Sequence, residues 1–193
     1  MSKKRFTTPS PEGLAEAARR VRARGLPPVH RWKPAFSGDI DMRIARDGSW
    51  YYQGSRIERA ALVALFSTIL RREGEKYFLV TPAEKVGITV EDAPFVAVDV
   101  TATGRGRDQQ IVFDTNLGDR VVAGPRHPIR VERDRETGEP SPYVLVRDNL
   151  EALIDRKSFY RLVDLGSHED GWFGLRSDGV FFRVIASDEI TGD

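Results

Sequence analysis

The sequence contains no cysteine, so disulfide bonds, thiolate metal ligands and cysteine nucleophiles are all excluded. It also has no excess of one charge, because 30 basic and 29 acidic side chains give a formal net charge of +1. A dedicated nucleic-acid-binding protein is normally basic overall or over one large patch. No apolar run approaches the roughly 18 residues of a membrane-spanning helix, and the N-terminus lacks the apolar segment of a secretory signal. We therefore expect a cytoplasmic protein without a nucleic-acid or membrane partner.

Signatures of several enzyme classes are missing as well. The sequence has neither a G-x-S-x-G nucleophile elbow nor a phosphate-binding G-x-x-x-x-G-K loop. Gly104 and Gly106 begin a G-x-G, but Gln109 stands where a dinucleotide-binding loop has its third glycine. The three histidines are far apart in the sequence, at His30, His127 and His168. None has a second ligand at helical or hairpin spacing, so we expect no metal site, no cofactor and no catalytic residue.

The most informative segment is residues 48–100. Ser55 is followed three residues later by Glu58, which is the spacing of a capping box at a helix N-terminus. Apolar side chains then recur every three or four residues as far as Leu70, and Gly74 is a typical helix stop. Three β-rich runs follow, at residues 77–80, 86–90 and 95–100. The segment predicts a helix packed on an antiparallel sheet.

Two Asp-Gly turns indicate β-hairpins, one in residues 40–52 and one in residues 172–185. An aromatic pair follows the turn in both hairpins. Each hairpin is adjacent to a predicted helix, of which the second is expected to open at Asp148. We infer an internal duplication from this recurrence.

The predicted fold class is α+β, with two small, structurally related halves that each pack a helix on a mostly antiparallel sheet. Residues 1–35 form an N-terminal helix and an extended arm, residues 36–104 the N-terminal half, and residues 105–193 the C-terminal half. The division near residue 105 follows from the polar, glycine-bearing run at 103–110.

The N-terminal helix, predicted between Ser10 and Gly25, has a narrow apolar stripe and a strongly basic remainder. Its basic residues are Arg19, Arg20, Arg22 and Arg24. This face either contacts an acidic partner or a phosphate group, or is simply solvated.

Polar groups at strand ends of the second half form the predicted ligand site. They are Asn116, Asp119, His127, Arg130, Tyr143 and Arg147. Arginines and an asparagine beside an imidazole suit a planar or phosphorylated ligand, on whose ring Tyr143 would stack. Lys85 of the first half would form a matching lip if the halves face each other. Alternatively, Asn116 and Asp119 shape a turn and the arginines lie on the outer face of the sheet.

The sequence resembles domain-of-unknown-function family 1285, a group of small bacterial proteins. The similarity is carried by residues 26–32, 47–85, 90–98, 115–132 and 142–156. The resemblance implies a duplicated α+β architecture whose C-terminal half is superficially similar to pleckstrin-homology folds. It also implies a nucleotide-like ligand between the halves and a role in signal transduction, under oxidative stress in one interpretation. It implies no catalytic residue.

Three functional hypotheses follow. The first is a non-enzymatic sensor that binds a nucleotide-like molecule between its halves and acts on a signalling protein. The second is a protein–protein adaptor without a small ligand, which uses the basic N-terminal helix or a strand edge. The third is a nucleotide or phosphoester hydrolase with Glu91, Asp92 or His127 as acid or base.

Overall fold

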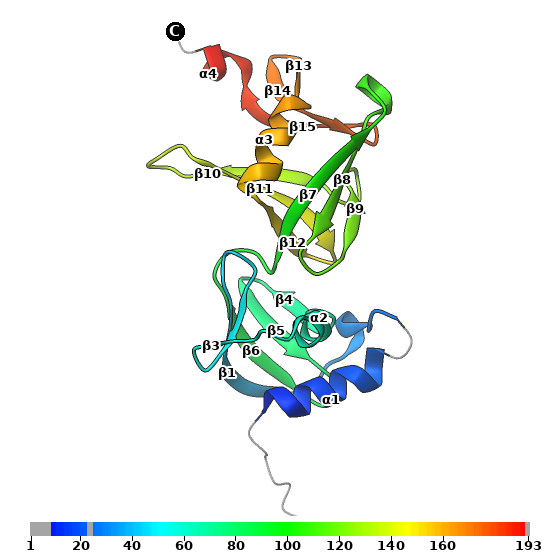
Figure 1. Ribbon diagram of the computed structural model, residues 1–193, viewed down its shortest axis with the longest axis vertical. Coiled ribbons are helices and arrows are strands. Elements are labelled where there is room, and N and C mark those ends of the chain that lie inside the picture. The colour runs from blue at the N-terminus through cyan, green and yellow to red at the C-terminus, as the bar shows by residue number, and fades with distance from the viewer. Residues whose placement is uncertain (1–8, 23–24, 192–193) are drawn as a thin grey trace, which may run out of the picture. The chain divides into compact units, whose positions relative to one another are not determined.

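The structure is a computed structural model of the 193-residue chain, and it describes residues 9–22 and 25–191 (Figure 1). The chain divides into two compact units, Met1–Glu91 and Asp92–Asp193. Of the segment 1–35 that was predicted as helix and arm, residues 1–8 and 23–24, including Arg24, lie outside the described residues. No helix in the described part of the chain combines the length and the apolar character needed to cross a membrane.

A six-stranded sheet forms the body of the first unit, in the order β3-β2-β1-β6-β5-β4. Its strands are β1 (Phe36–Ile44), β2 (Trp50–Tyr52), β3 (Ser55–Arg56), β4 (Leu70–Glu73), β5 (Lys76–Val80) and β6 (Lys85–Val90). β1 and β6 are parallel and all other neighbours are antiparallel. The sheet therefore consists of two three-stranded meanders, joined where the first strand of one pairs with the last strand of the other.

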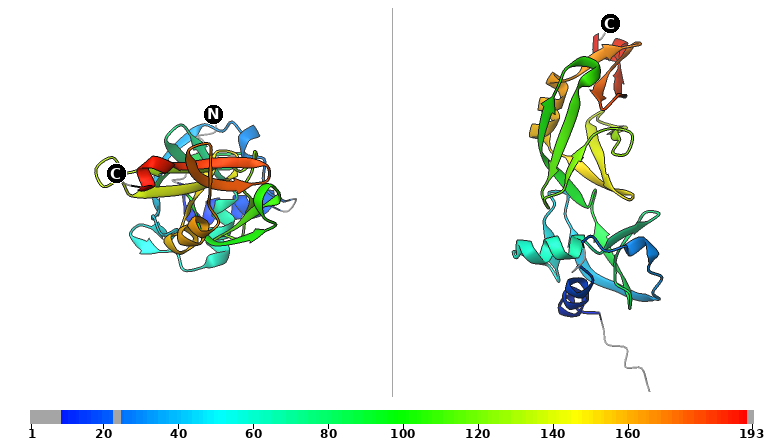
Figure 2. Two further views of the ribbon diagram at one scale, coloured as in Figure 1. Left: turned by 90° about the horizontal axis from the view of Figure 1, so that it is seen from above. Right: turned by 90° about the vertical axis from the view of Figure 1, so that its right-hand side faces the viewer.

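Two helices, α1 (Pro11–Arg22) and α2 (Ala60–Ser67), lie on the same side of this sheet (Figures 1 and 2). The apolar side of α1 is buried through Leu14 and Ala18, as its stripe predicts. Phe66 of α2 stacks on Trp50 of the sheet, with ring centroids 6.2 Å apart. Between the helices, the short helix η1 (Val29–Arg31) is held by Arg71, whose Nη1 donates to the carbonyl of Val29 at 3.0 Å.

The capping box expected at Ser55 and Glu58 is wrong. Ser55 is a strand residue that pairs with Tyr52, and the turn between them has positive φ at both Gln53 and Gly54. A turn of this kind favours a hairpin, so the chain forms β3 before it turns into α2. The helix begins after Arg59 without a side-chain cap and ends at Ser67, and the rest of the predicted helix is strand β4.

The main sheet of the second unit repeats the topology of the first, in the order β10-β11-β12-β7-β8-β9. Its strands are β7 (Phe95–Thr103), β8 (Gln110–Thr115), β9 (Arg120–Val122), β10 (Ile129–Arg133), β11 (Pro140–Arg147) and β12 (Leu150–Ile154). Again the first and last strands, β7 and β12, pair in parallel and the other neighbours are antiparallel. The predicted α+β duplication is confirmed, but the counterpart of the 40–52 hairpin is β7–β8 and not residues 172–185.

The boundary between the halves lies at Glu91/Asp92 and not near residue 105. β7 is a central strand of the second sheet, so the chain enters the second unit before β7 begins. The polar run at 103–110 is instead the β7–β8 connection, which contains the short helix η2 (Gly106–Asp108).

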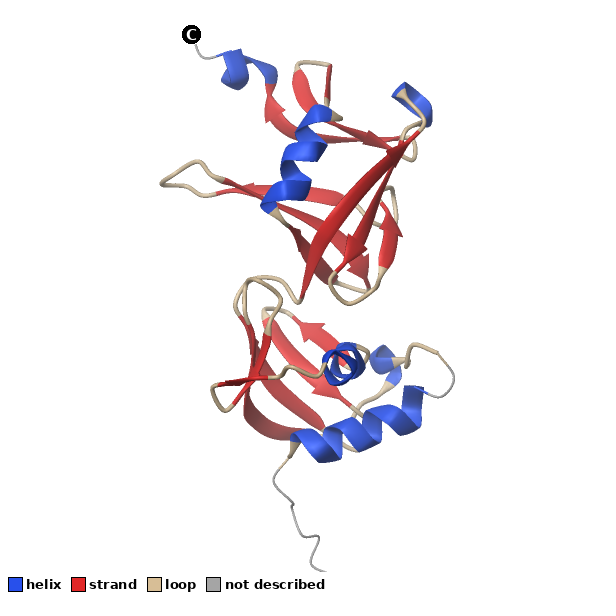
Figure 3. Cartoon of the chain, viewed as in Figure 1, coloured by secondary structure: helices blue, strands red, loops and turns tan. Residues whose placement is uncertain are grey.

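The second unit also carries α3 (Arg156–Asp164), α4 (Ser187–Thr191) and a three-stranded sheet of β13 (Ser167–Glu169), β14 (Trp172–Ser177) and β15 (Val180–Ala186) (Figure 3). The predicted hairpin at 172–185 is confirmed as β14–β15. The helix expected to open at Asp148 is wrong, because Asp148 has a positive φ in the turn between β11 and β12. α3 begins only after Asp155, whose carboxylate caps it by accepting the Ser158 N–H at 2.7 Å.

Ser177, which is fully buried, attaches the three-stranded sheet to the main one. Its hydroxyl accepts the N–H of Ile111 at 2.8 Å and donates to the carbonyl of Ala123 at 2.7 Å.

Candidate functional site

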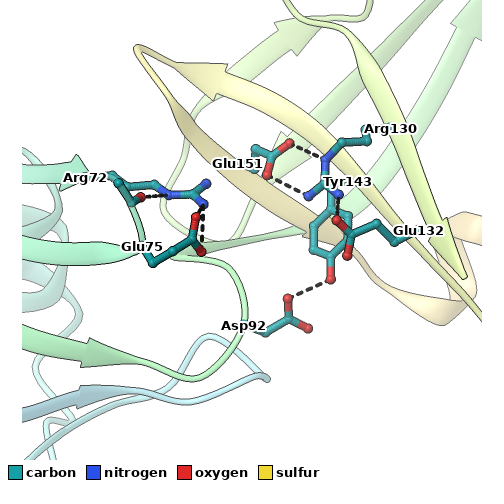
Figure 4. A network of polar contacts seen from close by, with 8 residues as sticks. Arg72, Glu75, Asp92, Arg130, Glu132, Tyr143 and Glu151 are labelled. Carbon is teal, nitrogen blue, oxygen red and sulfur yellow. Dashed lines mark hydrogen bonds and ion pairs between the residues drawn. The ribbon is translucent and has the colours of Figure 1, made fainter. Parts of the chain in front are cut away.

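Five side chains of the second unit form one polar cluster, which we call the Arg130 cluster (Figure 4). Its members are Asp92, Arg130, Glu132, Tyr143 and Glu151. The register across β10, β11 and β12 aligns Arg130 with Tyr143 and Tyr143 with Leu153. Because side chains alternate along a strand, Glu132 and Glu151 lie on the same face of the sheet as Arg130 and Tyr143.

Arg130 is held in a fixed plane by two carboxylates. Its Nε and Nη2 donate to the two oxygens of Glu151 at 2.9 and 2.8 Å, and its Nη1 donates to Glu132. The guanidinium lies over the ring of Tyr143, with Cζ 4.4 Å from the ring centroid. The hydrogen bonds to Glu151 raise the pKa of Arg130 further above its ordinary value, against the opposing effect of desolvation. The guanidinium is thus permanently charged and oriented.

Tyr143 is 7% exposed, and its hydroxyl donates a hydrogen bond to Asp92 Oδ1 at 2.8 Å. Burial, followed by this hydrogen bond and the charge of Asp92, raises the pKa of Tyr143 to about 12. The phenol therefore remains a neutral donor throughout the physiological pH range.

The charge of the Arg130 cluster is unusual for an anion site. Three carboxylates, from Asp92, Glu132 and Glu151, accompany one guanidinium, so the cluster is net negative. Each of the three guanidinium nitrogens already donates to a carboxylate, so three of the five N–H donors are occupied. A phosphate group that approached Arg130 would be repelled by these acids.

Two other predicted site residues form a separate pair. Arg147 Nη1 donates to Asp119 Oδ1 at 2.5 Å, and its guanidinium lies over the ring of Phe95 at 4.7 Å. Both charged side chains are largely buried, at 18% and 22% exposure. Asp119 also closes the turn after β8, where its backbone N–H donates to Thr115 Oγ1 at 3.0 Å.

Asn116 and His127 bond to the backbone. Asn116 accepts the N–H of Val96 at 3.0 Å through its side chain and donates its own backbone N–H to the carbonyl of Val96 at 2.8 Å. His127 Nδ1 lies 2.9 Å from the carbonyl oxygen of Leu145. Asn116 thus shapes the turn after β8 and ties it to β7, as the alternative interpretation of the sequence held.

Lys85 belongs to the first unit and is not part of the Arg130 cluster. Its Nζ pairs with Glu73 at 2.9 Å and lies over the ring of Phe78, 4.8 Å from the centroid. Hydrogen bonding to Lys85, with a smaller contribution from Arg71, lowers the pKa of Glu73 below its ordinary value.

The ligand site predicted from the sequence did not include the acids of the Arg130 cluster, although Asp92 was named as an acid or base in the hydrolase hypothesis. Arg130 and Glu132 are two residues apart, a spacing that places both on one face of a strand. Glu151 gave no such signal, because it was placed in a predicted helix rather than in β12. Within the part of the chain that the structure describes, no three His, Asp or Glu side chains are grouped so that they could hold a metal ion.

Comparison with known proteins gives one family. A family model described as the N-terminal domain of a domain of unknown function, DUF1285, matches residues 27–93. Its C-terminal counterpart matches residues 94–184. No curated protein matches the chain.

Two solved structures resemble the chain. The crystal structure of a DUF1285 family protein from Silicibacter pomeroyi DSS-3 is 60% identical in sequence, with a TM-score of 0.86 over 93% of this chain and 98% of the other. A DUF1285 family protein from Shewanella baltica OS155 is 27% identical, with a TM-score of 0.50 over 64% of this chain and 90% of the other.

Proposed function

Because the chain belongs to the DUF1285 family, whose description names no activity, we propose its function from the site itself. The protein binds a nucleotide-like small molecule, without catalysing a reaction, and the Arg130 cluster receives the planar base of that molecule. A signalling partner would then recognise the ligand-bound protein. The observation that carries this proposal is the guanidinium of Arg130, which Glu132 and Glu151 hold over the ring of Tyr143.

A fixed guanidinium plane is a good surface for a second planar group. The guanidinium of Arg130 lies over Tyr143 and its nitrogens bond to carboxylates, yet the side chain is 41% exposed. We infer that the exposed part is the face opposite Tyr143. A nucleobase stacked there would gain about 1–3 kcal/mol, the usual contribution of base stacking in proteins.

The acids of the cluster favour the base over the phosphates. Glu132 uses one oxygen on Arg130 and its side chain is 64% exposed, so it has capacity to accept further hydrogen bonds. Exocyclic amino and ring N–H groups of a purine are suitable donors. The negative charge of the cluster repels phosphate groups, which would have to extend away from it.

The acid–base candidates of the hydrolase hypothesis are engaged in other interactions. Glu91 pairs with Arg43 and accepts the backbone N–H of Arg46 at 3.0 Å. Asp92 accepts the hydroxyl of Tyr143, and His127 bonds to a backbone carbonyl. These contacts support binding as the proposed role.

The proposal is tested by titrating the full chain with nucleosides and nucleotides, with calorimetry as the readout. A purine nucleoside should bind, and Arg130→Lys should weaken it about tenfold, because lysine keeps the charge but has no plane to stack on. Arg120→Lys is the matched control, since Arg120 lies in the same sheet, is more exposed, and pairs with Asp114 only at 3.7 Å.

Equal affinities of the two variants would reject this site. Slow appearance of a hydrolysed nucleotide in the presence of magnesium or manganese would instead support the hydrolase hypothesis.

A further inference from the structure

The first unit has a pocket of about 480 Å³ between the end of α1 and the start of α2, which we call the arginine pocket. It is lined by Arg19, Arg22, Arg59, Ala61, Leu62 and Leu65. None of these lining side chains is acidic. The pocket is of the size that accommodates small-molecule ligands, about 300–1,000 Å³.

The three arginines of the pocket carry uncompensated charge. Within residues 9–22 and 25–191, no ion pair joins Arg19, Arg22 or Arg59 to a carboxylate. Arg20, the neighbour of Arg19 on the same helix, does pair with Glu16. Three exposed cations at one pocket create a strongly positive local potential.

The remaining lining residues add an apolar floor. Leu65 is 4% exposed, and Leu62 lies one turn before it on α2. The start of α2 reinforces the positive charge, because Arg59 supplies no side-chain cap and the first N–H groups of a helix have no acceptor within it. The three arginines and the apolar side chains of α2 together suit an anion that also carries an apolar group.

We propose that the arginine pocket binds a phosphate monoester with a short apolar substituent. Guanidinium groups match the oxygens of phosphate in bidentate geometry, and three of them suit a dianion better than a single carboxylate. The apolar substituent lies on Leu62 and Leu65. This inference is independent of the nucleobase site, which uses other residues of the other unit.

The experiment is a titration of the ¹⁵N-labelled full chain, followed by amide NMR, with hexyl phosphate as the probe. The expected result is saturable shifts confined to α1 and α2. Inorganic phosphate should bind more weakly because it lacks the apolar group, and hexanol should not bind. Arg19→Gln, Arg22→Gln and Arg59→Gln should each weaken hexyl phosphate about tenfold, the value of one charge-assisted hydrogen bond.

Arg20→Gln is the matched control, since it removes one positive charge from α1 outside the pocket lining, and its affinity should stay at the wild-type value. Equal losses in Arg20→Gln and Arg22→Gln would overturn the proposal, because they would show a delocalised charge effect. Absence of shifts at saturating hexyl phosphate, or equal affinity for inorganic phosphate, would also overturn it.

Two further titrations distinguish a small phosphate ester from a membrane surface and from an acidic protein segment. Binding to phosphatidic acid vesicles without binding to free hexyl phosphate would identify a membrane surface and reject a small-molecule pocket. Binding only to an acidic, leucine-containing peptide would reject it in favour of a protein contact. Leu62→Ser provides a second variant, which should reduce hexyl phosphate affinity while leaving that of inorganic phosphate unchanged.

Discussion

Each unit has a group of side chains built on arginine, the Arg130 cluster in the second unit and the arginine pocket in the first, and the two differ in the presence of acids. In the Arg130 cluster, Glu132 and Glu151 accept from all three guanidinium nitrogens and fix the plane of the group. In the arginine pocket, no lining residue is acidic and the charge is uncompensated among the described residues. Arginine is therefore held in place by acids in one unit and lines a pocket without acids in the other.

Secondary structure explains this difference. Neighbouring β-strands place Arg130 directly beside residues from two other segments, so acids distant in sequence can meet it. On α1, Arg19 and Arg22 lie one turn apart, and Glu16, the acid one turn before Arg19, pairs with Arg20 instead. Arg130 is therefore paired through the sheet, whereas the acid nearest to Arg19 on its helix is engaged by another arginine.

The largest expected effect concerns Tyr143, on which the Arg130 cluster is built. Tyr143→Ala should reduce the free energy of unfolding by about 3–4 kcal/mol, because it removes a buried ring together with the support of Arg130. The measurement is urea denaturation of the full chain. Tyr143→Phe retains the ring and should cost only about 1 kcal/mol. A loss below 1 kcal/mol for the alanine variant would show that the cluster is not ordered around this ring.

The raised pKa of Tyr143 gives the second expectation, which is a pH dependence of stability. An unfolded tyrosine loses its proton near pH 10, whereas folded Tyr143 holds it to about pH 12. The folded state thus binds more protons in this interval, so the contribution is complete below pH 10 and is lost as the pH rises through about 12. The loss should reach about 2.7 kcal/mol, because each unit of pKa difference corresponds to about 1.4 kcal/mol.

Tyr143→Phe is the control for this pH dependence. Phenylalanine does not titrate, so the unfolding free energy of the wild type relative to Tyr143→Phe should fall between pH 10 and 12. The difference should change sign, because the loss exceeds the roughly 1 kcal/mol that the hydroxyl contributes at neutral pH. A constant difference over that range would contradict the raised pKa. Arginine is the only ionisable residue type that lines the arginine pocket, so we expect no such pH dependence of stability from the pocket.

Sequence reasoning found the fold class because both units have strong local signals. Asp-Gly turns and alternating strands marked the hairpins, and the predicted β-rich run at 77–80 lies in β5. It failed where a helical period overlaps a strand. Ser55 has the spacing of a helix cap and Leu70 continues the apolar period of the predicted helix, yet both residues pair with neighbouring strands in the sheet. Local pattern cannot reveal a partner strand that is distant in the chain.

The predicted site was incomplete for the same reason. Arg130 and Tyr143 were identified as ligand-binding residues, and the structure brings them into contact. Glu151 was missed because its role depends on the register between β11 and β12. Asn116 and Asp119 were identified by residue type alone, whereas their hydrogen bonds show that they shape the turn after β8.

Removing one acid from the Arg130 cluster should have the third-largest effect. Glu151→Gln eliminates the charge opposite Arg130, so the free energy of unfolding should fall by about 1–1.5 kcal/mol, since Glu151 is only 19% exposed. Glu16→Gln is the matched control, because the Glu16–Arg20 pair is well exposed and should contribute less than about 0.5 kcal/mol. Both unfolding free energies are measured by denaturation. Equal losses for Glu151→Gln and Glu16→Gln would show that the Arg130 cluster contributes no more to stability than an exposed ion pair.

The smallest expected effect is a gain, and it comes from supplying the arginine pocket with the acid it lacks. Arg59→Asp places a capping carboxylate at the uncapped start of α2 and relieves repulsion with Arg19 and Arg22. Both changes stabilise the helix, so the free energy of unfolding should rise by about 0.5–1 kcal/mol. Arg59→Asn separates the two causes, because it caps the helix without adding negative charge. The measurement is the unfolding free energy of both variants in low salt. If Arg59→Asp is no more stable than Arg59→Asn, the arginines of the pocket do not repel one another measurably. The pocket would then differ from the Arg130 cluster in stability only through the missing helix cap.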